Sequence, residues 1–165
     1  MKRVAKLDKF TAHRSKKPGD IGEDLAEILL NKNGFKNVRN LNHHRKNFPF
    51  ADFYAEKESV NYIISVKIRN KYQRSGSLND RYKLGKKCYE NSEPAEKEFN
   101  AVAAWLTTSF DSKTYSAYFG LLSLLNGSRG VRMTEKAIAF YECLAKEEPH
   151  SYNYGELKNV YEVKD

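Results

Sequence analysis

The chain has 165 residues, with 29 lysines and arginines against 21 aspartates and glutamates and a formal net charge of +8. Its 40% hydrophobic and 30% charged residues are typical of a folded globular domain and exclude a largely disordered chain. No apolar run approaches the ~20 residues that cross a bilayer, and the two cysteines, Cys88 and Cys143, lack metal-ligand spacing. We therefore expect a cytoplasmic protein without a membrane span.

Positive charge is concentrated in two segments. Residues 1–18 carry seven basic residues against Asp8, and residues 67–87 carry eight against Asp80. Lysine and arginine clusters favour a polyanionic partner, because neutralised phosphates release counterions. We expect residues 1–18 to form a basic N-terminal arm and residues 19–165 a single domain, with a core at about 20–125 and an extension at about 126–165.

The first half of the chain predicts a helix followed by strands. Apolar residues recur at helical spacing over residues 21–33, with Asp20 as the expected N-cap and Gly34 beyond the end. Alternating and β-branched residues then predict three strands, at residues 36–42, 50–56 and 60–69. Only residues 57–59 separate the last two, which indicates a hairpin.

The second half predicts a basic segment, two more strands and a last helix. Residues 70–79 have loop composition, and a short helix is expected at about 81–91, ending before Pro94. Further strands are expected at residues 99–110 and 114–125. Thr134 is the expected cap of a helix that runs to about residue 147. This order of elements indicates a mixed α/β fold.

One group of polar side chains interrupts the apolar strands. Alternation places Ser65, Lys67 and Arg69 on one face of the third strand, and Asp52 on a face of the second. Pairing of the two strands brings Asp52 beside Ser65 and Lys67. Such a carboxylate either binds a divalent cation next to the lysine or forms a half-buried salt bridge with it.

The pattern of Asp52 followed by Ser65-Val66-Lys67, preceded by a helix with Gly22-Glu23-x-x-Ala26, resembles the PD-(D/E)xK nuclease superfamily. Its αβββαβ core has the order of elements expected for about residues 20–125. The resemblance implies a restriction-endonuclease-like α/β fold, with a central mixed sheet flanked by helices. The remaining C-terminal residues are expected to add a helical extension.

The resemblance also implies roles for individual residues. Asp52 and Glu23 become metal ligands, the backbone carbonyl of Val66 a further ligand, and Lys67 the group that acts on the attacking water or the developing charge. The implied cofactor is Mg²⁺, with Mn²⁺ as an alternative. Ser65 belongs to the catalytic group but stands where the family has a second acid. Glu23 is the preferred replacement for that acid, and the other candidates are Asp80, Glu90 and Glu93.

Basic residues around this group are expected to contact nucleic acid: Arg45, Lys46, Arg69, Lys71, Arg74, Arg81 and Lys83. Tyr72 and Tyr82 lie among them as candidate stacking rings. The resemblance implies a Mg²⁺-dependent DNA endonuclease of the restriction-like, homing or junction-resolving kind, acting as a homodimer. The alternatives are a catalytically inactive DNA-binding or recombination accessory protein on the same fold, and an unrelated RNA-binding module.

Overall fold

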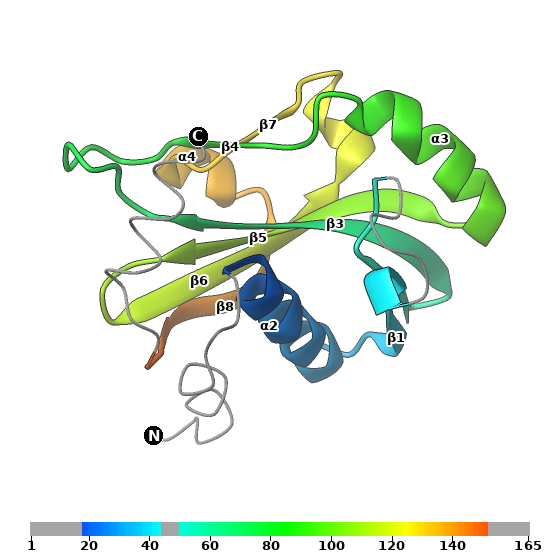
Figure 1. Cartoon of the computed structure of the whole chain (residues 1–165), viewed down its shortest axis with the longest axis horizontal. Helices are drawn as coiled ribbons and strands as arrows, with labels where there is room; N and C mark the ends of the chain where they lie inside the picture. The colour runs from blue at the N-terminus through cyan, green and yellow to red at the C-terminus, as the bar shows by residue number, and fades with distance from the viewer. Residues whose placement is uncertain (1–17, 44–49, 152–165) are drawn as a thin grey trace.

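A six-stranded mixed sheet organises the computed structural model, which describes residues 18–43 and 50–151 (Figure 1). In spatial order its strands are β1 (Lys36–Asn40), β2 (Phe53–Lys57), β3 (Val60–Asn70), β5 (Val102–Phe110), β6 (Thr114–Leu121) and β8 (Glu142–Pro149). β3 and β5 run parallel, and every other neighbouring pair is antiparallel. The expected central mixed sheet is confirmed.

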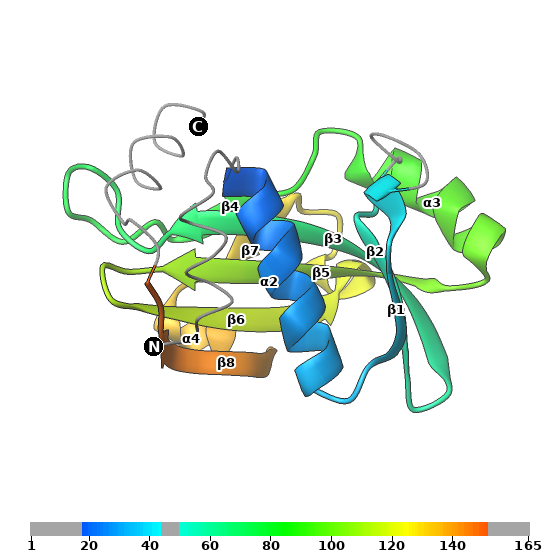
Figure 2. The same cartoon turned by 60° about the horizontal axis from the view of Figure 1, so that its bottom comes forward.

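Helices and a two-stranded ribbon cover the two faces of this sheet. The remaining elements are α2 (Pro18–Lys32), η1 (Leu41–His43), β4 (Arg81–Lys83), α3 (Cys88–Phe99), η2 (Leu122–Leu125), β7 (Gly130–Arg132) and α4 (Glu135–Ile138). α2 crosses one face (Figure 2), and α3, α4 and the ribbon formed by β4 and β7 lie over the other (Figure 1). Within the described ranges, we find no helix with the length and apolar character needed to traverse a bilayer.

Strand alternation divides the interior into two apolar cores. Ile64 and Ile68 of β3 pack toward α2, whereas Ile63 packs on the opposite face with Trp105. Leu25 and Leu29 of α2 are 1% and 2% exposed, and each such burial contributes roughly 1.5–3 kcal/mol. β3 is therefore apolar on both faces along most of its length, and its polar residues need another explanation.

Among the described strands, β2 pairs with only the first part of β3 on its outer side. The β2–β3 ladder joins Phe53–Lys57 to Val60–Ile64, while β5 pairs with β3 from Tyr62 to Asn70. Beyond Ile64, β3 thus becomes an edge strand on the side that β2 has left. The residues predicted to be catalytic lie at this divergence.

The C-terminal helix predicted over residues 134–147 is wrong beyond its first turn. Thr134 does cap a helix, accepting a hydrogen bond from the N–H of Ala137 at 3.3 Å, but α4 ends at Ile138 and β8 follows. Leu144 and Ala145 of β8 are buried in the core under α2. Pairing with β6 and this burial outweigh the helical spacing, so a sixth strand replaces the expected helical extension.

Two further boundaries differ from prediction. Asp20 lies inside α2 instead of capping it, because the helix begins at Pro18, a residue suited to a first helical turn. The helix expected at 81–91 is instead β4 followed by α3, which passes through Pro94. β4 forms because β7, distant in sequence, supplies its only strand partner in the described part of the chain.

Gly22 permits the close approach of α2 to β3, and we predict that Gly22→Ala is destabilising. A Cβ atom there would lie 3.0 Å from Cγ2 and 3.2 Å from Cβ of Ile68. The overpacking is expected to lower the free energy of unfolding by about 1–3 kcal/mol in urea denaturation. The control is Gly85→Ala, where no atom lies within 4 Å of the added Cβ and stability should not fall. Equal stability of Gly22→Ala and wild type would contradict this account of the packing.

Candidate active site

Asp52 sits where β2 and β3 separate, and its side chain replaces a strand contact. The Asp52 N–H donates to the Ile64 carbonyl at 2.8 Å, and the Val66 N–H donates to Asp52 Oδ2 at 2.8 Å. An oxygen of the Asp52 carboxylate thus accepts the hydrogen bond that a backbone carbonyl of β2 would accept if the β2–β3 ladder continued. The Leu41 N–H also donates to the Asp52 carbonyl at 2.8 Å, which ties η1 to the same point. Backbone hydrogen bonds therefore fix the position of this carboxylate.

Glu23 reaches the same point from α2. The amide nitrogen of Asn42 donates to Glu23 Oε2 at 2.9 Å and to Asp52 Oδ1 at 3.1 Å, so one amide joins the two carboxylates. Asn40 donates to the other oxygen of Glu23 at 3.1 Å, and its own side-chain oxygen accepts the Asn42 N–H at 2.9 Å. The structure therefore brings Glu23 and Asp52 together, as the resemblance implied.

The two asparagines were not predicted as site residues. Both lie close to the motif in sequence, but asparagine at a strand end ordinarily indicates a turn, so nothing in the pattern distinguished them. Their partners come from α2 and from the start of β2, which only the tertiary fold brings near. Asn42 is half-buried, and its two hydrogen bonds hold both acids in place.

Ser65, Val66 and Lys67 complete the group on β3. Ser65 is 6% exposed, whereas Lys67 is half-buried, and its positive charge acts on Asp52. The N–H and C=O of one strand residue point to the same side. Because the Val66 N–H points to Asp52, the Val66 carbonyl faces the same open edge.

The pKa of Asp52 is raised above the ordinary value of an aspartate. The main cause is burial, which disfavours the charged form. The hydrogen bond from the Val66 N–H, the hydrogen bond from Asn42 and the charge of Lys67 act in the opposite direction but do not cancel it. A neighbouring cation would stabilise the ionised form of this buried carboxyl group.

The donor set fits a hard divalent cation. Asp52 and Glu23 provide two carboxylates and Val66 provides a carbonyl, and oxygen ligands of this kind suit Mg²⁺, which keeps several waters. Within residues 18–43 and 50–151, no cluster of three or more His, Cys, Asp or Glu side chains is suited to hold a metal. A metal here would rely on two acids, one carbonyl and water.

The other acids weighed as replacements for Ser65 lie elsewhere. Asp80 is exposed just before β4, and its carbonyl accepts the Met133 N–H at 2.8 Å. Glu90 and Glu93 are exposed on α3. The hydrogen bonds of the described residues connect Glu23, and none of these three acids, to Asp52 through Asn42.

The predicted nucleic-acid contacts fall into two groups, apart from Arg45 and Lys46, which lie outside the described residues. Arg69 lies on the open edge of β3, where its guanidinium donates to the Ile68 carbonyl at 2.8 Å. Lys71 and Arg74 follow in the next loop, and Arg81 and Lys83 are exposed on β4. Of the two candidate rings, Tyr82 is 1% exposed and cannot stack on a base, so that prediction is wrong. Tyr72 is half-buried, with the Lys71 ammonium 5.5 Å from its ring centre.

Comparison with protein-family models finds no match, and comparison with curated proteins finds none either. Among solved structures, the chain is similar to Archaeoglobus fulgidus Hjc, a Holliday junction resolvase from an archaeal hyperthermophile. The identity is 20% and the TM-score 0.55, over 77% of this chain and 97% of Hjc. The likeness supports the restriction-endonuclease-like fold that was expected from the sequence.

Because folding raises the pKa of Asp52, ionisation of its carboxyl group lowers the free energy of unfolding. A carboxyl whose pKa is raised by folding binds more protons in the folded state, so stability falls as pH rises from about 4 through the raised pKa. Asp52→Asn lacks this titration. Asparagine also replaces one accepting oxygen of Asp52 with an NH2 donor, which removes a hydrogen bond at every pH. We therefore expect the Tm of the variant relative to wild type, measured by scanning calorimetry without divalent metal, to increase between pH 4 and pH 8. A Tm difference that stays constant with pH, or changes in the opposite direction, would contradict this.

Proposed function

We propose that the protein is a metal-dependent DNA endonuclease that cleaves branched DNA, with the four-way junction as its substrate. The observation that carries the proposal is the pair of carboxylates, Glu23 and Asp52, joined by one asparagine beside Lys67 at the open edge of β3. The fold, shared with a protein described as a Holliday junction resolvase, supports the choice of substrate. The net charge of +8 supports binding to DNA, and we propose that this occurs in the cytoplasm.

The residues that would hold Mg²⁺, or Mn²⁺ in its place, are Asp52, Glu23 and the carbonyl of Val66. The metal, when bound, supplies a Lewis acid and an acidified water for attack on phosphorus. Ser65 supplies no charge at the position of the family's second acid. Glu23 provides that second negative charge from α2 instead.

The chain itself contributes positioning and positive charge. Asp52 is fixed by the Val66 N–H, so a group bound to it meets the phosphate in a defined direction. Lys67, held two residues beyond Ser65 on the same face, places an ammonium where it orients water or stabilises the pentacovalent phosphorus. Arg69 lies two residues further along that face and is suited to hold a neighbouring phosphate. The half-buried setting excludes much of the surrounding water, which strengthens each of these interactions.

Junction resolution requires two cuts, so we propose that the protein acts as a homodimer with one site per chain. A two-fold arrangement of sites matches the two-fold symmetry of a four-way junction. All described contacts lie within one chain, so we propose the homodimer from the symmetry of the substrate alone.

The first test is cleavage of a synthetic four-way junction and of supercoiled plasmid, each with Mg²⁺, Mn²⁺ or EDTA. We expect metal-dependent cuts in the junction, and a reduction of at least about a hundred-fold in Lys67→Ala, because a group that stabilises transition-state charge is lost. Junction binding by Lys67→Ala in EDTA should persist. Binding without cleavage under every cation would overturn the nuclease and favour the alternative, an inactive DNA-binding protein. Preferential cleavage of the linear or plasmid duplex would overturn the choice of substrate.

The second test identifies the acid that compensates for the absence of a carboxylate at Ser65. We expect Glu23→Gln to abolish junction cleavage, because the metal loses one of its two carboxylates. Asp80→Asn is the matched control, since it removes the same charge from an exposed site, and it should cleave at close to the wild-type rate. Full activity in Glu23→Gln together with loss in Asp80→Asn would transfer the role to Asp80.

A further inference from the structure

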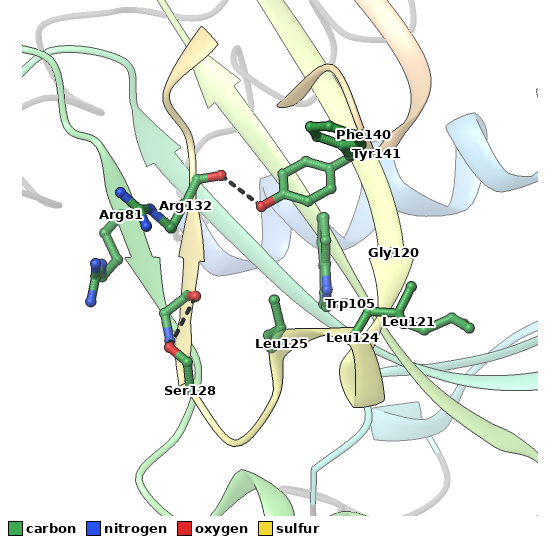
Figure 3. Close-up of a pocket in the computed structure, with 11 residues that line it drawn as sticks. Arg81, Trp105, Gly120, Leu121, Leu124, Leu125, Ser128, Arg132, Phe140 and Tyr141 are labelled. Carbon is green, nitrogen blue, oxygen red and sulfur yellow. Dashed lines mark hydrogen bonds between the residues drawn. The ribbon is translucent and has the colours of Figure 1, made fainter. Parts of the chain in front are cut away.

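A cavity lies on the face of the sheet opposite α2. Its volume is about 400 Å³, and it is bounded by the β4–β7 ribbon, by η2 and by the residues that follow α4 (Figure 3). Trp105 of β5 lines its interior and lies against Gly120 of β6, where any side chain would overlap the indole ring. The lack of a side chain at Gly120 therefore leaves the space that the Trp105 indole ring occupies. Nothing in the proposed chemistry uses this cavity.

Contacts within the chain hold one wall of the cavity in place without a ligand. The Tyr141 ring stands edge-on to Trp105, with 4.7 Å between ring centres and 81° between ring planes. The Tyr141 hydroxyl donates to the Arg132 carbonyl at 2.9 Å, the bond drawn in Figure 3. The ring is therefore fixed between β5 and β7, so a ligand would find a formed surface at little entropic cost.

Large apolar side chains gather at the mouth of the cavity. Phe140 is 85% exposed and Leu124 is 72% exposed, and both line the cavity. Within residues 21–42 and 50–151, Val102, at 37%, is the remaining exposed large hydrophobic residue. Exposed apolar groups that converge on one cavity mark a binding surface, whereas scattered ones do not.

Two arginines form the opposite rim. Arg81 and Arg132 are directly paired across the β4–β7 ribbon, and both are exposed. Like charges directly opposite each other on two strands are destabilising, and an anion between them offsets that repulsion. Figure 3 shows the two guanidinium groups on the side of the ribbon away from Trp105, so an anion would lie outside the cavity and an apolar group within it.

Further cations lie near the ribbon and near the buried Cys88. Burial raises the pKa of the Cys88 thiol, and among the opposing effects are the nearby positive charges of Arg129 and Lys67. Arg129 in turn donates to the Leu84 carbonyl at 3.4 Å, next to the exposed Lys83 of β4. Lys67 and Arg129 therefore both lie near Cys88, and Arg129 lies next to the end of β4.

We propose that this cavity binds an unpaired nucleotide of single-stranded DNA, with the base against Phe140 and the phosphates along Arg81 and Arg132. The proposal rests on the proposed function, since a nuclease for branched DNA meets unpaired bases where strands separate. A stacking ring beside a cationic groove is the usual way to bind single strands without sequence preference. The volume lies within the range of pockets that take small ligands. An acidic protein segment would also meet the arginines, but the further cations at the ribbon, Lys83 and Arg129, favour the longer polyanion, the DNA strand.

The test uses Trp105, the single tryptophan of the chain, as a fluorescent reporter inside the cavity. The full-length protein is titrated with a twelve-nucleotide oligothymidylate in EDTA, so that no cleavage is needed. We expect saturable quenching, and a dissociation constant about tenfold or more higher in Phe140→Ala, because a base stack is lost. Arg132→Ala should weaken binding and reduce its salt dependence.

Two matched controls distinguish the cavity from general charge or hydrophobicity. Val102→Ala also shortens an exposed apolar side chain, and Lys113→Ala also removes one exposed positive charge, but neither residue lines the cavity. Both should bind the oligonucleotide like wild type. Absence of quenching, or equal affinity in Phe140→Ala and wild type, would overturn the proposal and leave the surface to a protein partner. Junction cleavage without quenching refutes the cavity alone, whereas quenching without cleavage refutes the nuclease alone.

Discussion

The hydrogen bond from the Val66 N–H to the Asp52 carboxylate is the contact on which the candidate site depends. It occurs because β2 begins at Phe53 while β3 continues, leaving a strand N–H that needs an acceptor. By accepting it, Asp52 closes the end of the β2–β3 ladder and places its second oxygen toward Asn42 and Glu23. Asp52 thus ends the pairing of β2 with β3 and also belongs to the candidate site.

The acid pair also links two layers of the fold. Glu23 comes from α2, on one face of the sheet, while Lys67 and Ser65 face the other layer. Glu23 and Asp52 meet because Gly22 lets the helix approach Ile68 closely, and because Asn42 connects the helix acid to the strand acid. A site assembled across an edge in this way depends on correct packing of α2, so stability and the geometry of the candidate site are coupled at Gly22.

Local pattern was enough to predict most of the central sheet and the acid–lysine pair. Alternation in β3 identified the face of Ser65 and Lys67, and the helical spacing of α2 identified its buried side. Elements that rely on distant partners were not predictable, as the strands β4 and β8 show. β8 carries helical spacing in its sequence, and only its pairing with β6 and the burial of Leu144 decide the outcome. Asn42 was missed for the same reason, since its importance comes from two partners in other elements.

The outer side of β3 beyond Ile64 has no strand partner among residues 18–43 and 50–151, and this has a consequence for the solution behaviour of the protein. An exposed strand edge is a template on which another chain adds its own strand, and natural proteins oppose this with charged residues at the edge. Here Lys67 and Arg69 project from that strand, and the Arg69 guanidinium already occupies the Ile68 carbonyl. The two cations proposed to contact phosphates are therefore also charges of the kind that oppose strand addition at a sheet edge.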